Sequence, residues 1–338
     1  MRIKCVLGLT KDQWHNTTLP KDESKESQLK KKAKLLKWSK IPRSKQDIST
    51  IKQLCEDTYA SQRKDILEMH KIIKDFQTRK SRKKITEEES YPEISDLVNE
   101  WPFLFRTEMT LHMNRLYNIN VEDDLSLYMN FTGKQVLDYL VFSQGMEGKV
   151  LEQQMTKSKE KSAIDEPEVL SLLMLFSIHF KEKVGKFIIK AEVSLQMKDV
   201  RDLPIPLTPC ILSCGSDLFR AEKYYACMDK YCYFATRSFR EAFCVVFSSY
   251  FVFHLDFPQN FGLTLEYIQR QVFDINPEVG TKRAEGSSSS PVSVKILDVI
   301  RDCQAYHTAL QKANSVNDQD SPLNLSKSSN ISFSQTSS

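Results

Sequence analysis

The sequence predicts a mostly helical protein with a small α+β unit in its C-terminal half, a long amphipathic N-terminal helix and disordered termini. Apolar residues recur at three- and four-residue steps over 47–84, whereas short apolar runs bounded by Pro and Gly alternate with helical patterns over 166–282. Residues 1–44 have no sustained apolar period, and residues 315–338 have few apolar residues. The 338 residues are 41% hydrophobic, enough for a core, and only nine are Gly. This composition argues against glycine-rich phosphate loops, propellers and collagen-like arrays.

The N-terminal third is predicted to hold a basic disordered tail over 1–46 and one long amphipathic helix over 47–84. Pro42 marks a break shortly before the helix. The helix is predicted from a single apolar stripe, which consists of Ile48, Ile51, Cys55, Tyr59, Ile66, Met69, Ile73 and Phe76. A helix of this length is suited to packing against the body or against another chain.

Residues 86–157 are predicted to be a helical bundle region. A capping-box pattern, Thr86 followed by Glu89, precedes its first helix. Trp101-Pro102 predicts a break, because the residue before a proline disfavours helical backbone. Gly133, Gly145 and Gly148 fall where further short helices are expected to end.

Residues 166–282 are predicted to form the α+β domain. Strands are expected over 186–193 and 209–215, and a further strand-like segment over 250–257. Helices are expected over 168–183, 217–230, 238–247 and 263–273. Beyond the domain, we expect a linker over 283–291, a helix over 292–312 and a disordered Ser-rich tail over 313–338.

Charge is distributed unevenly along the chain. Residues 21–84 hold 20 Lys and Arg against 9 Asp and Glu, whereas the whole chain has a net charge of +4. The basic third is therefore a candidate contact surface for a polyanion. The alternatives are that this segment is a nuclear import signal or a solvated tail. The candidate contact residues are Lys30, Lys31, Lys32, Lys34, Lys37, Lys83 and Lys84.

The opening residues Met1–Leu9 have an apolar run too short for a secretory signal. No apolar stretch reaches the ~18 residues needed to cross a bilayer. We therefore expect a cytoplasmic or nuclear protein with no membrane partner. In such a compartment the eight cysteines are expected to be buried free thiols.

Four cysteines have a spacing that invites a test for zinc: Cys210, Cys214, Cys227 and Cys232. Cys210 and Cys214 fall on a predicted strand and Cys227 in a predicted helix, so buried thiols are the favoured interpretation and no metal or cofactor is predicted. The chain also lacks a Gly-x-Ser-x-Gly elbow, a phosphate-binding Gly-x4-Gly-Lys loop and a His-Glu-x-x-His helix. We therefore predict no catalytic residues and no enzymatic activity.

Several blocks of the sequence resemble a group of vertebrate proteins, abundant in fish, that are similar to sterile alpha motif domain-containing protein three. The blocks lie within 50–282 and are Tyr59–Lys64, Glu100–Phe105, Leu203-Pro204 with Thr208–Ile211 and Cys214-Gly215, Phe247–Tyr250, Gly262–Arg270, and Ile275–Glu278 with Gly280–Lys282. The resemblance implies no known activity, cofactor or catalytic residue. It does not extend to the sterile alpha motif itself, because the first 44 residues are too few and too basic for that helical module.

Two functions are therefore open from the sequence. The first is a non-enzymatic protein-protein interaction or regulatory module, with 47–84 as the contact element and an unknown protein partner. The alternative is a nucleic-acid-associated protein that binds through its basic residues 21–84. The oligomeric state is not predicted.

Overall fold

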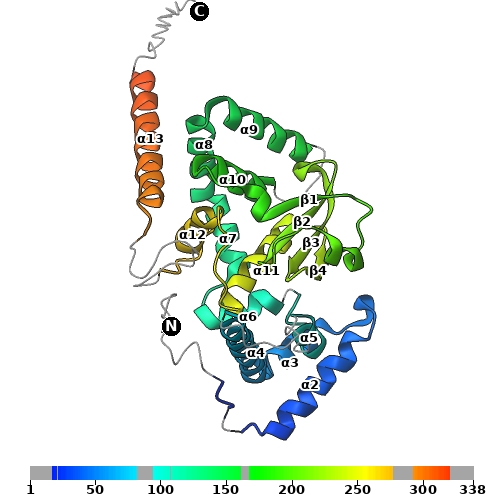
Figure 1. Cartoon of the computed structure of the whole chain (residues 1–338). Helices are drawn as coiled ribbons and strands as arrows, with labels where there is room; N and C mark the ends of the chain where they lie inside the picture. Colours follow the sequence, from blue (N-terminus) through cyan, green and yellow to red (C-terminus); the bar gives the residue numbers. More distant parts are fainter. Residues whose placement is uncertain are drawn as a thin grey trace, which may run out of the picture.

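The computed structural model describes residues 17–20, 22–81, 94–106, 108–160, 167–276 and 292–319 (Figure 1). Its α-helices are α2 (Lys25–Ser39), α3 (Ile48–Asp57), α4 (Tyr59–Ser81), α5 (Ile94–Glu100), α6 (Glu108–Tyr117), α7 (Val121–Asn130), α8 (Thr132–Ser143), α9 (Gly145–Glu160), α10 (Pro167–His179), α11 (Phe239–Val252), α12 (Gly262–Gln271) and α13 (Val294–Gln319). Its strands are β1 (Ile188–Ala191), β2 (Cys210–Gly215), β3 (Ala221–Met228) and β4 (Tyr231–Thr236). The predicted fold class, mostly helical with a small sheet in the C-terminal half, is confirmed.

The four strands form one sheet in the order β1-β2-β3-β4. β1 runs parallel to β2, whereas the pairs β2–β3 and β3–β4 are antiparallel. The tight β3–β4 connection has two residues, Asp229 and Lys230, with φ of 55° and 57°. Positive φ at both central positions is the geometry of a type I′ hairpin turn, whose twist matches that of the flanking strands.

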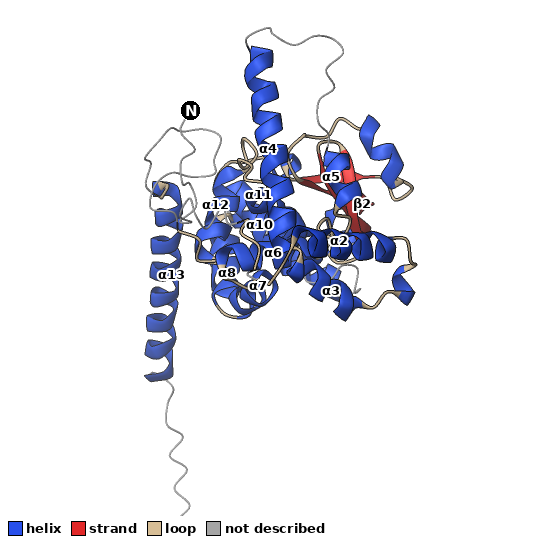
Figure 2. Cartoon of the chain, turned by 90° about the horizontal axis from the view of Figure 1, so that it is seen from below, coloured by secondary structure: helices blue, strands red, loops and turns tan. Residues whose placement is uncertain are grey.

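Both faces of the sheet are covered. α11 packs against β2, β3 and β4 on one face, where Phe239 and Phe243 join the main core. The opposite face carries a smaller apolar cluster that includes Val200, from the short 3-10 helix Met197–Asp202, together with Ile205 and Leu212. Figure 2 shows the strands on one side of the molecule, with most of the helices gathered on the other.

Two expectations within the α+β domain are wrong. Residues 217–230 form β3 after a short 3-10 turn, not a helix, and 250–257 is not a strand, because α11 continues to Val252. β3 is buried on both faces over Tyr224–Met228, so it lacks the polar–apolar alternation that marks a half-exposed strand. α11 ends where His254 takes a positive φ of 53°, a conformation that ends many helices. The strand at 209–215 and the helices beginning near 168, 238 and 263 are confirmed.

The N-terminal third is more ordered than expected. The expected disordered tail over 1–46 is wrong for 25–39, which form α2, while residues 1–16 lie outside the described residues. The segment predicted as one helix over 47–84 is divided, because α3 ends at Asp57, Thr58 is its C-cap and α4 begins at Tyr59. Residues 82–84 lie outside the described residues. Asp47 caps α3 by accepting hydrogen bonds from the backbone N–H groups of Ser49 and Thr50. The Thr50 and Ser49 hydroxyl groups also donate to this carboxylate, and their bonds, together with the backbone bonds, lower the Asp47 pKa to about 2.

The part of the predicted helical region 86–157 that the structure describes comprises α5 to α9, and α9 continues to Glu160. Residues 86–93, with the predicted capping box, lie outside the described residues. The predicted break at Trp101-Pro102 is present, since α5 ends at Glu100. α13 lies beside α8 (Figure 1), with the Tyr306 ring stacked on Phe142 at 4.8 Å between centroids. α13 reaches Gln319, so the predicted disordered tail begins too early; the linker over 283–291 and residues 320–338 lie outside the described residues. In the described segments, none of the helices combines the length and the apolar character needed to span a membrane.

Replacing Gly148 with Ala is expected to separate α8 from α9 and destabilise the fold by about 1–3 kcal/mol. A Cβ at Gly148 would lie 2.3 Å from the Val141 carbonyl oxygen and 2.8 Å from its Cα, which are backbone atoms that cannot rotate away. Urea unfolding measures the loss. Gly185→Ala is the matched control, because a Cβ there meets nothing within 4 Å. Equal midpoints for the two variants would contradict this account of the α8–α9 contact.

Candidate polyanion interface

Five of the seven predicted contact lysines lie on α2: Lys30, Lys31, Lys32, Lys34 and Lys37. Lys83 and Lys84 lie outside the described residues. The N-cap of α2 is Ser24, whose side chain accepts a hydrogen bond from Ser27 N–H at 3.0 Å. The position of each lysine along α2 determines whether it faces the body of the protein or solvent, because residues three and four apart share a helix face.

α2 is joined to the body by a buried amide. Gln28 is 4% exposed, and its Nε2 donates to the Asp57 carbonyl oxygen at 2.9 Å. Its Oε1 accepts a hydrogen bond from Ser61 Oγ at 2.7 Å. Leu35, two turns further along the same face, is 2% exposed and belongs to the main core. The inward face of α2 is thus defined by Gln28 and Leu35.

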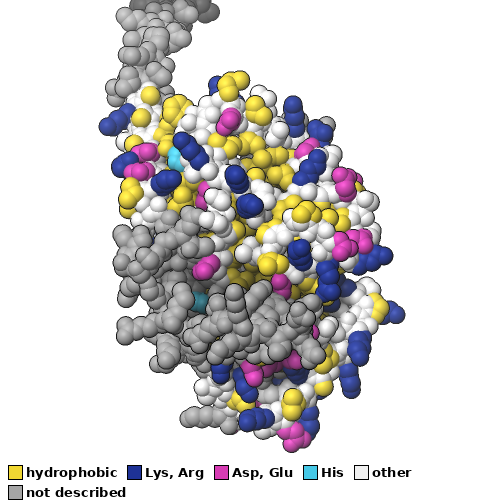
Figure 3. Space-filling model, viewed as in Figure 1, with side chains coloured by type: hydrophobic (Ala, Val, Ile, Leu, Met, Phe, Trp, Pro, Cys, Tyr) yellow, Lys and Arg dark blue, Asp and Glu magenta, His cyan; other side chains and the backbone are white. Residues whose placement is uncertain are grey.

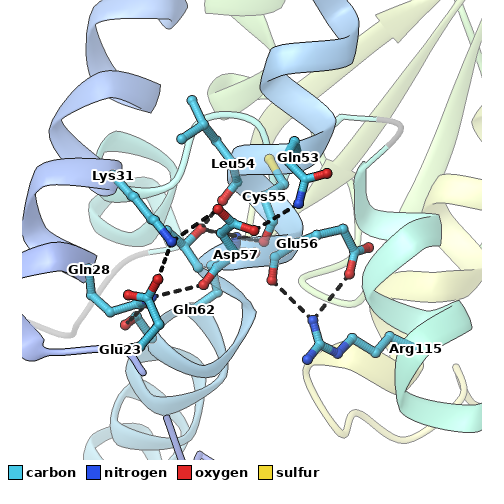
Figure 4. A network of polar contacts seen from close by, with 12 residues as sticks. Glu23, Gln28, Lys31, Gln53, Leu54, Cys55, Glu56, Asp57, Gln62 and Arg115 are labelled. Atoms are coloured by element: carbon cyan, nitrogen blue, oxygen red, sulfur yellow. Dashed lines mark hydrogen bonds and ion pairs between the residues drawn. The ribbon is translucent and has the colours of Figure 1, made fainter. Parts of the chain in front are cut away.

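Lys31 lies on the inward face and forms two ion pairs. Its Nζ contacts Glu23, and it lies 3.0 Å from an Asp57 carboxylate oxygen at the end of α3 (Figure 4). The hydrogen bond from Lys31 is the largest cause that lowers the Glu23 pKa to about 2, and the same bond raises the pKa of Lys31. Lys31 therefore holds α2 in place.

Lys32 connects α2 to two further helices. Its Nζ lies 2.8 Å from a Glu100 carboxylate oxygen on α5 and 3.2 Å from Asp65 on α4. The same ammonium lies 4.3 Å from the centroid of the buried Trp101 ring, in cation–π contact. Trp101 Nε1 in turn donates to Asp65 at 2.8 Å. Two of the predicted contact lysines, Lys31 and Lys32, are thus engaged within the protein.

The remaining three lysines point to solvent. Lys30, Lys34 and Lys37 are exposed and are spaced by four and three residues, so they form one stripe along α2. Lys30 pairs with Glu26 at 2.8 Å, but both side chains are more than 70% exposed. Within the described residues neither Lys34 nor Lys37 forms an ion pair. Lys40 is also exposed and extends the stripe at the C-cap. Figure 3 shows Lys and Arg side chains on the part of the surface that α2 forms.

A cavity of about 670 Å³ lies along the inward edge of α2. Its charged lining residues are Asp22, Glu23, Lys31, Glu56, Asp57 and Arg115. Arg115, on α6, lies 3.1 Å from a Glu56 carboxylate oxygen (Figure 4). Its guanidinium also stacks over the Tyr59 ring at 4.1 Å from the centroid. Glu23, Glu56 and Asp57 are each paired with a cation, so this cavity is a polar seam that joins α2 and α3 to α6.

Behind the seam lies a buried polar group of side chains. Arg63 is 0% exposed, and its Nη1 donates to the Val252 carbonyl oxygen at 2.6 Å. The His112 ring lies 4.4 Å from the Tyr59 ring. Burial, with Arg63 and Arg115 nearby, holds the His112 pKa well below its usual range. This histidine is therefore neutral at physiological pH.

The four cysteines tested for zinc lie on one face of the sheet, in the smaller apolar cluster. Cys210 is opposite Cys227, and Cys227 is opposite Cys232. The expectation that Cys227 lies in a helix is wrong, since it lies on β3. Across the described ranges no three His, Cys, Asp or Glu side chains are arranged to hold a metal ion. The predicted burial of free thiols is confirmed for the seven described cysteines.

Native cysteines are expected to alkylate slowly, because the thiolate is the reactive form. Burial raises the pKa of Cys210 to about 12 and of Cys214 to about 11. Iodoacetamide labelling followed by mass spectrometry measures the rates in a Cys5→Ser variant, which removes the one cysteine outside the described residues. The seven remaining thiols should label fully in denaturant without reductant. Native labelling at the rate of a free thiol would contradict their burial.

Comparisons with models of protein families, with curated proteins and with solved structures give no match. The resemblance to proteins similar to sterile alpha motif domain-containing protein three therefore stays a prediction.

Proposed function

We propose that this protein is a non-enzymatic nucleic-acid-binding protein and that the outward stripe of α2 contacts the phosphate backbone. The observation that supports this most directly is that the lysines of α2 fall into two groups, one paired within the protein and one exposed to solvent. Lys31 and Lys32 fix the helix to the body, whereas Lys30, Lys34 and Lys37 face solvent. A helix fixed in this way presents its cations in a preset row, so less conformational entropy is lost on binding than from a flexible tail.

The salt dependence of binding tests this proposal. Four contacting lysines, with Lys40 included, release about four counterions, so affinity should fall about a hundredfold between 50 and 200 mM salt. Fluorescence anisotropy of labelled single-stranded and duplex oligonucleotides measures this slope on the full chain. Binding that is already negligible near ~150 mM salt would overturn the proposal.

A protein-interaction role is the second candidate, through a different surface from the one predicted. Residues over 47–84 contribute Ile51, Leu54 and Ile66 to the main core, so much of that segment packs inside the protein. Met146 and Val150, one turn apart on α9, are instead 76% and 49% exposed. Large exposed apolar residues on one helix face are typical of contact surfaces.

Crosslinking after nuclease treatment tests this role. A Met146→Glu, Val150→Glu variant should lose the protein partners that crosslink to the parent. Unchanged crosslinks would exclude this surface.

A further inference from the structure

A second hollow, of about 580 Å³, opens beside the sheet and shares no lining residue with the polar seam. Four segments that are distant in the sequence contribute to it. Arg43 follows α2, Lys198 lies in the 3-10 helix Met197–Asp202, Lys223 lies on β3, and Arg237 follows β4. The fold therefore brings four cations to one concave surface, an arrangement that the sequence spacing does not reveal.

The charge of this basic hollow is one-sided. Among its described lining residues there are four cations and no Asp or Glu. The chain as a whole has 48 Lys and Arg against 44 Asp and Glu, so a lining with four cations and no carboxylate differs from the composition of the chain. A concave surface lined by one sign of charge concentrates the potential that attracts the opposite ion. The basic hollow therefore favours an anion.

One cation is held in place by the protein itself. Lys223 Nζ donates to the Leu195 carbonyl oxygen at 2.8 Å and lies 5.2 Å from the centroid of the Tyr225 ring. Tyr225 is 5% exposed, and its hydroxyl donates to the same carbonyl at 3.0 Å. Because an ammonium carries three N–H groups, Lys223 keeps donors for a ligand.

The other three cations are exposed at the edge of the hollow. Within the described part of the chain, Arg43, Lys198 and Arg237 form no ion pairs with the protein. They can therefore turn toward a ligand without breaking an internal contact. Arginine suits phosphate in particular, since its planar fork donates two parallel hydrogen bonds to neighbouring oxygens.

From this charge and shape we infer that the basic hollow binds a triphosphate group, the chemistry shared by free nucleoside triphosphates and the 5′-triphosphate end of an RNA. A triphosphate carries about four negative charges, which match the four cations, whereas a carboxylate or a sulfate would leave most of them unneutralised. The volume of about 580 Å³ falls within the range typical of small-ligand sites. This inference does not rest on the proposed function of α2.

Calorimetric titration of the full chain near ~150 mM salt tests the inference with ATP, inorganic tripolyphosphate, AMP and sulfate. ATP and tripolyphosphate should both bind, and at least about tenfold more tightly than AMP, because they make additional charge-assisted hydrogen bonds. An Arg43→Gln, Arg237→Gln variant should lose about a hundredfold in affinity for both. The matched control is Lys34→Gln, Lys37→Gln, which removes the same charge from the outward stripe and should bind ATP as the parent does.

Two oligonucleotides of one sequence, with a 5′-triphosphate or a 5′-hydroxyl, distinguish the sources of the group. A preference for the triphosphate end that disappears in the Arg43→Gln, Arg237→Gln variant supports an RNA end as the ligand, whereas tight ATP binding without that preference supports a free nucleotide. The inference is overturned if neither ATP nor tripolyphosphate binds saturably. It is equally overturned if sulfate binds as tightly as tripolyphosphate, or if the double arginine variant binds like the parent.

Discussion

Replacing Glu266 with Ala is expected to destabilise the protein by about 3–5 kcal/mol, because it leaves a buried charge without its partner. Glu266 and Arg270 lie four residues apart on α12, with side chains 0% and 4% exposed, and Arg270 Nε lies 3.0 Å from Glu266 Oε1. The shift of the unfolding midpoint in guanidinium measures the loss, provided that the denaturant slope is unchanged.

Two comparisons make this prediction specific. Glu266→Gln keeps an acceptor for Arg270 Nε and should lose less stability than Glu266→Ala. Glu26→Ala removes an i,i+4 partner of the same kind from Lys30, but on an exposed surface where ion pairs contribute little. It should leave the midpoint unchanged. Equal effects at Glu266 and Glu26 would mean that burial does not control the strength of these pairs.

Changing the outward lysines and the inward lysines of α2 is expected to have opposite consequences. Lys30→Gln, Lys34→Gln, Lys37→Gln should leave thermal stability unchanged while lowering the salt slope of nucleic-acid binding by about one unit per lysine. Because the effect accumulates over three phosphate contacts, binding at low salt should fall by at least about tenfold.

Lys31→Gln, Lys32→Gln should do the reverse. These substitutions remove the ion pairs to Asp57, Asp65 and Glu100, so α2 should become sensitive to protease and the unfolding midpoint should fall. The binding slope of the folded protein should change less than in the outward variant, because these ammonium groups already have partners. If both sets changed the slope equally, the lysines would act as an undifferentiated basic run.

The local sequence pattern predicted a disordered tail where the structure has α2, and the composition of this helix explains the error. The helix buries only Gln28 and Leu35, so its sequence lacks the broad apolar stripe by which a packed helix is recognised. Its position depends on carboxylates that are distant in the chain, such as Glu100, 68 residues from Lys32. A partial signal was available, since Gln28, Lys31, Lys32 and Leu35 follow the three-to-four spacing of one helix face. Nothing local indicated which acids would meet that face.

Local sequence pattern was also insufficient to predict all the strands of the sheet. β2 was predicted from its bounding Pro and Gly, whereas β3 resembled a helix because both of its faces are buried and its aromatic residues show no alternation. The two turn residues, Asp229 and Lys230, are not one of the glycine-containing pairs that predict a type I′ hairpin from the sequence. β4 was therefore missed with it.

By itself the sequence determined what depends on neighbours along the chain: the helical majority, the break at Trp101-Pro102, and the excess of cations over 21–84. These features follow from backbone sterics, local hydrogen bonds and composition, which act over a few residues. Only the tertiary structure decided which lysines of α2 are paired with carboxylates and which face solvent. It alone brought Arg43, Lys198, Lys223 and Arg237 to one hollow. The physical reason is that Coulomb interactions depend on distance in space, and the packing of the core sets that distance independently of separation along the chain.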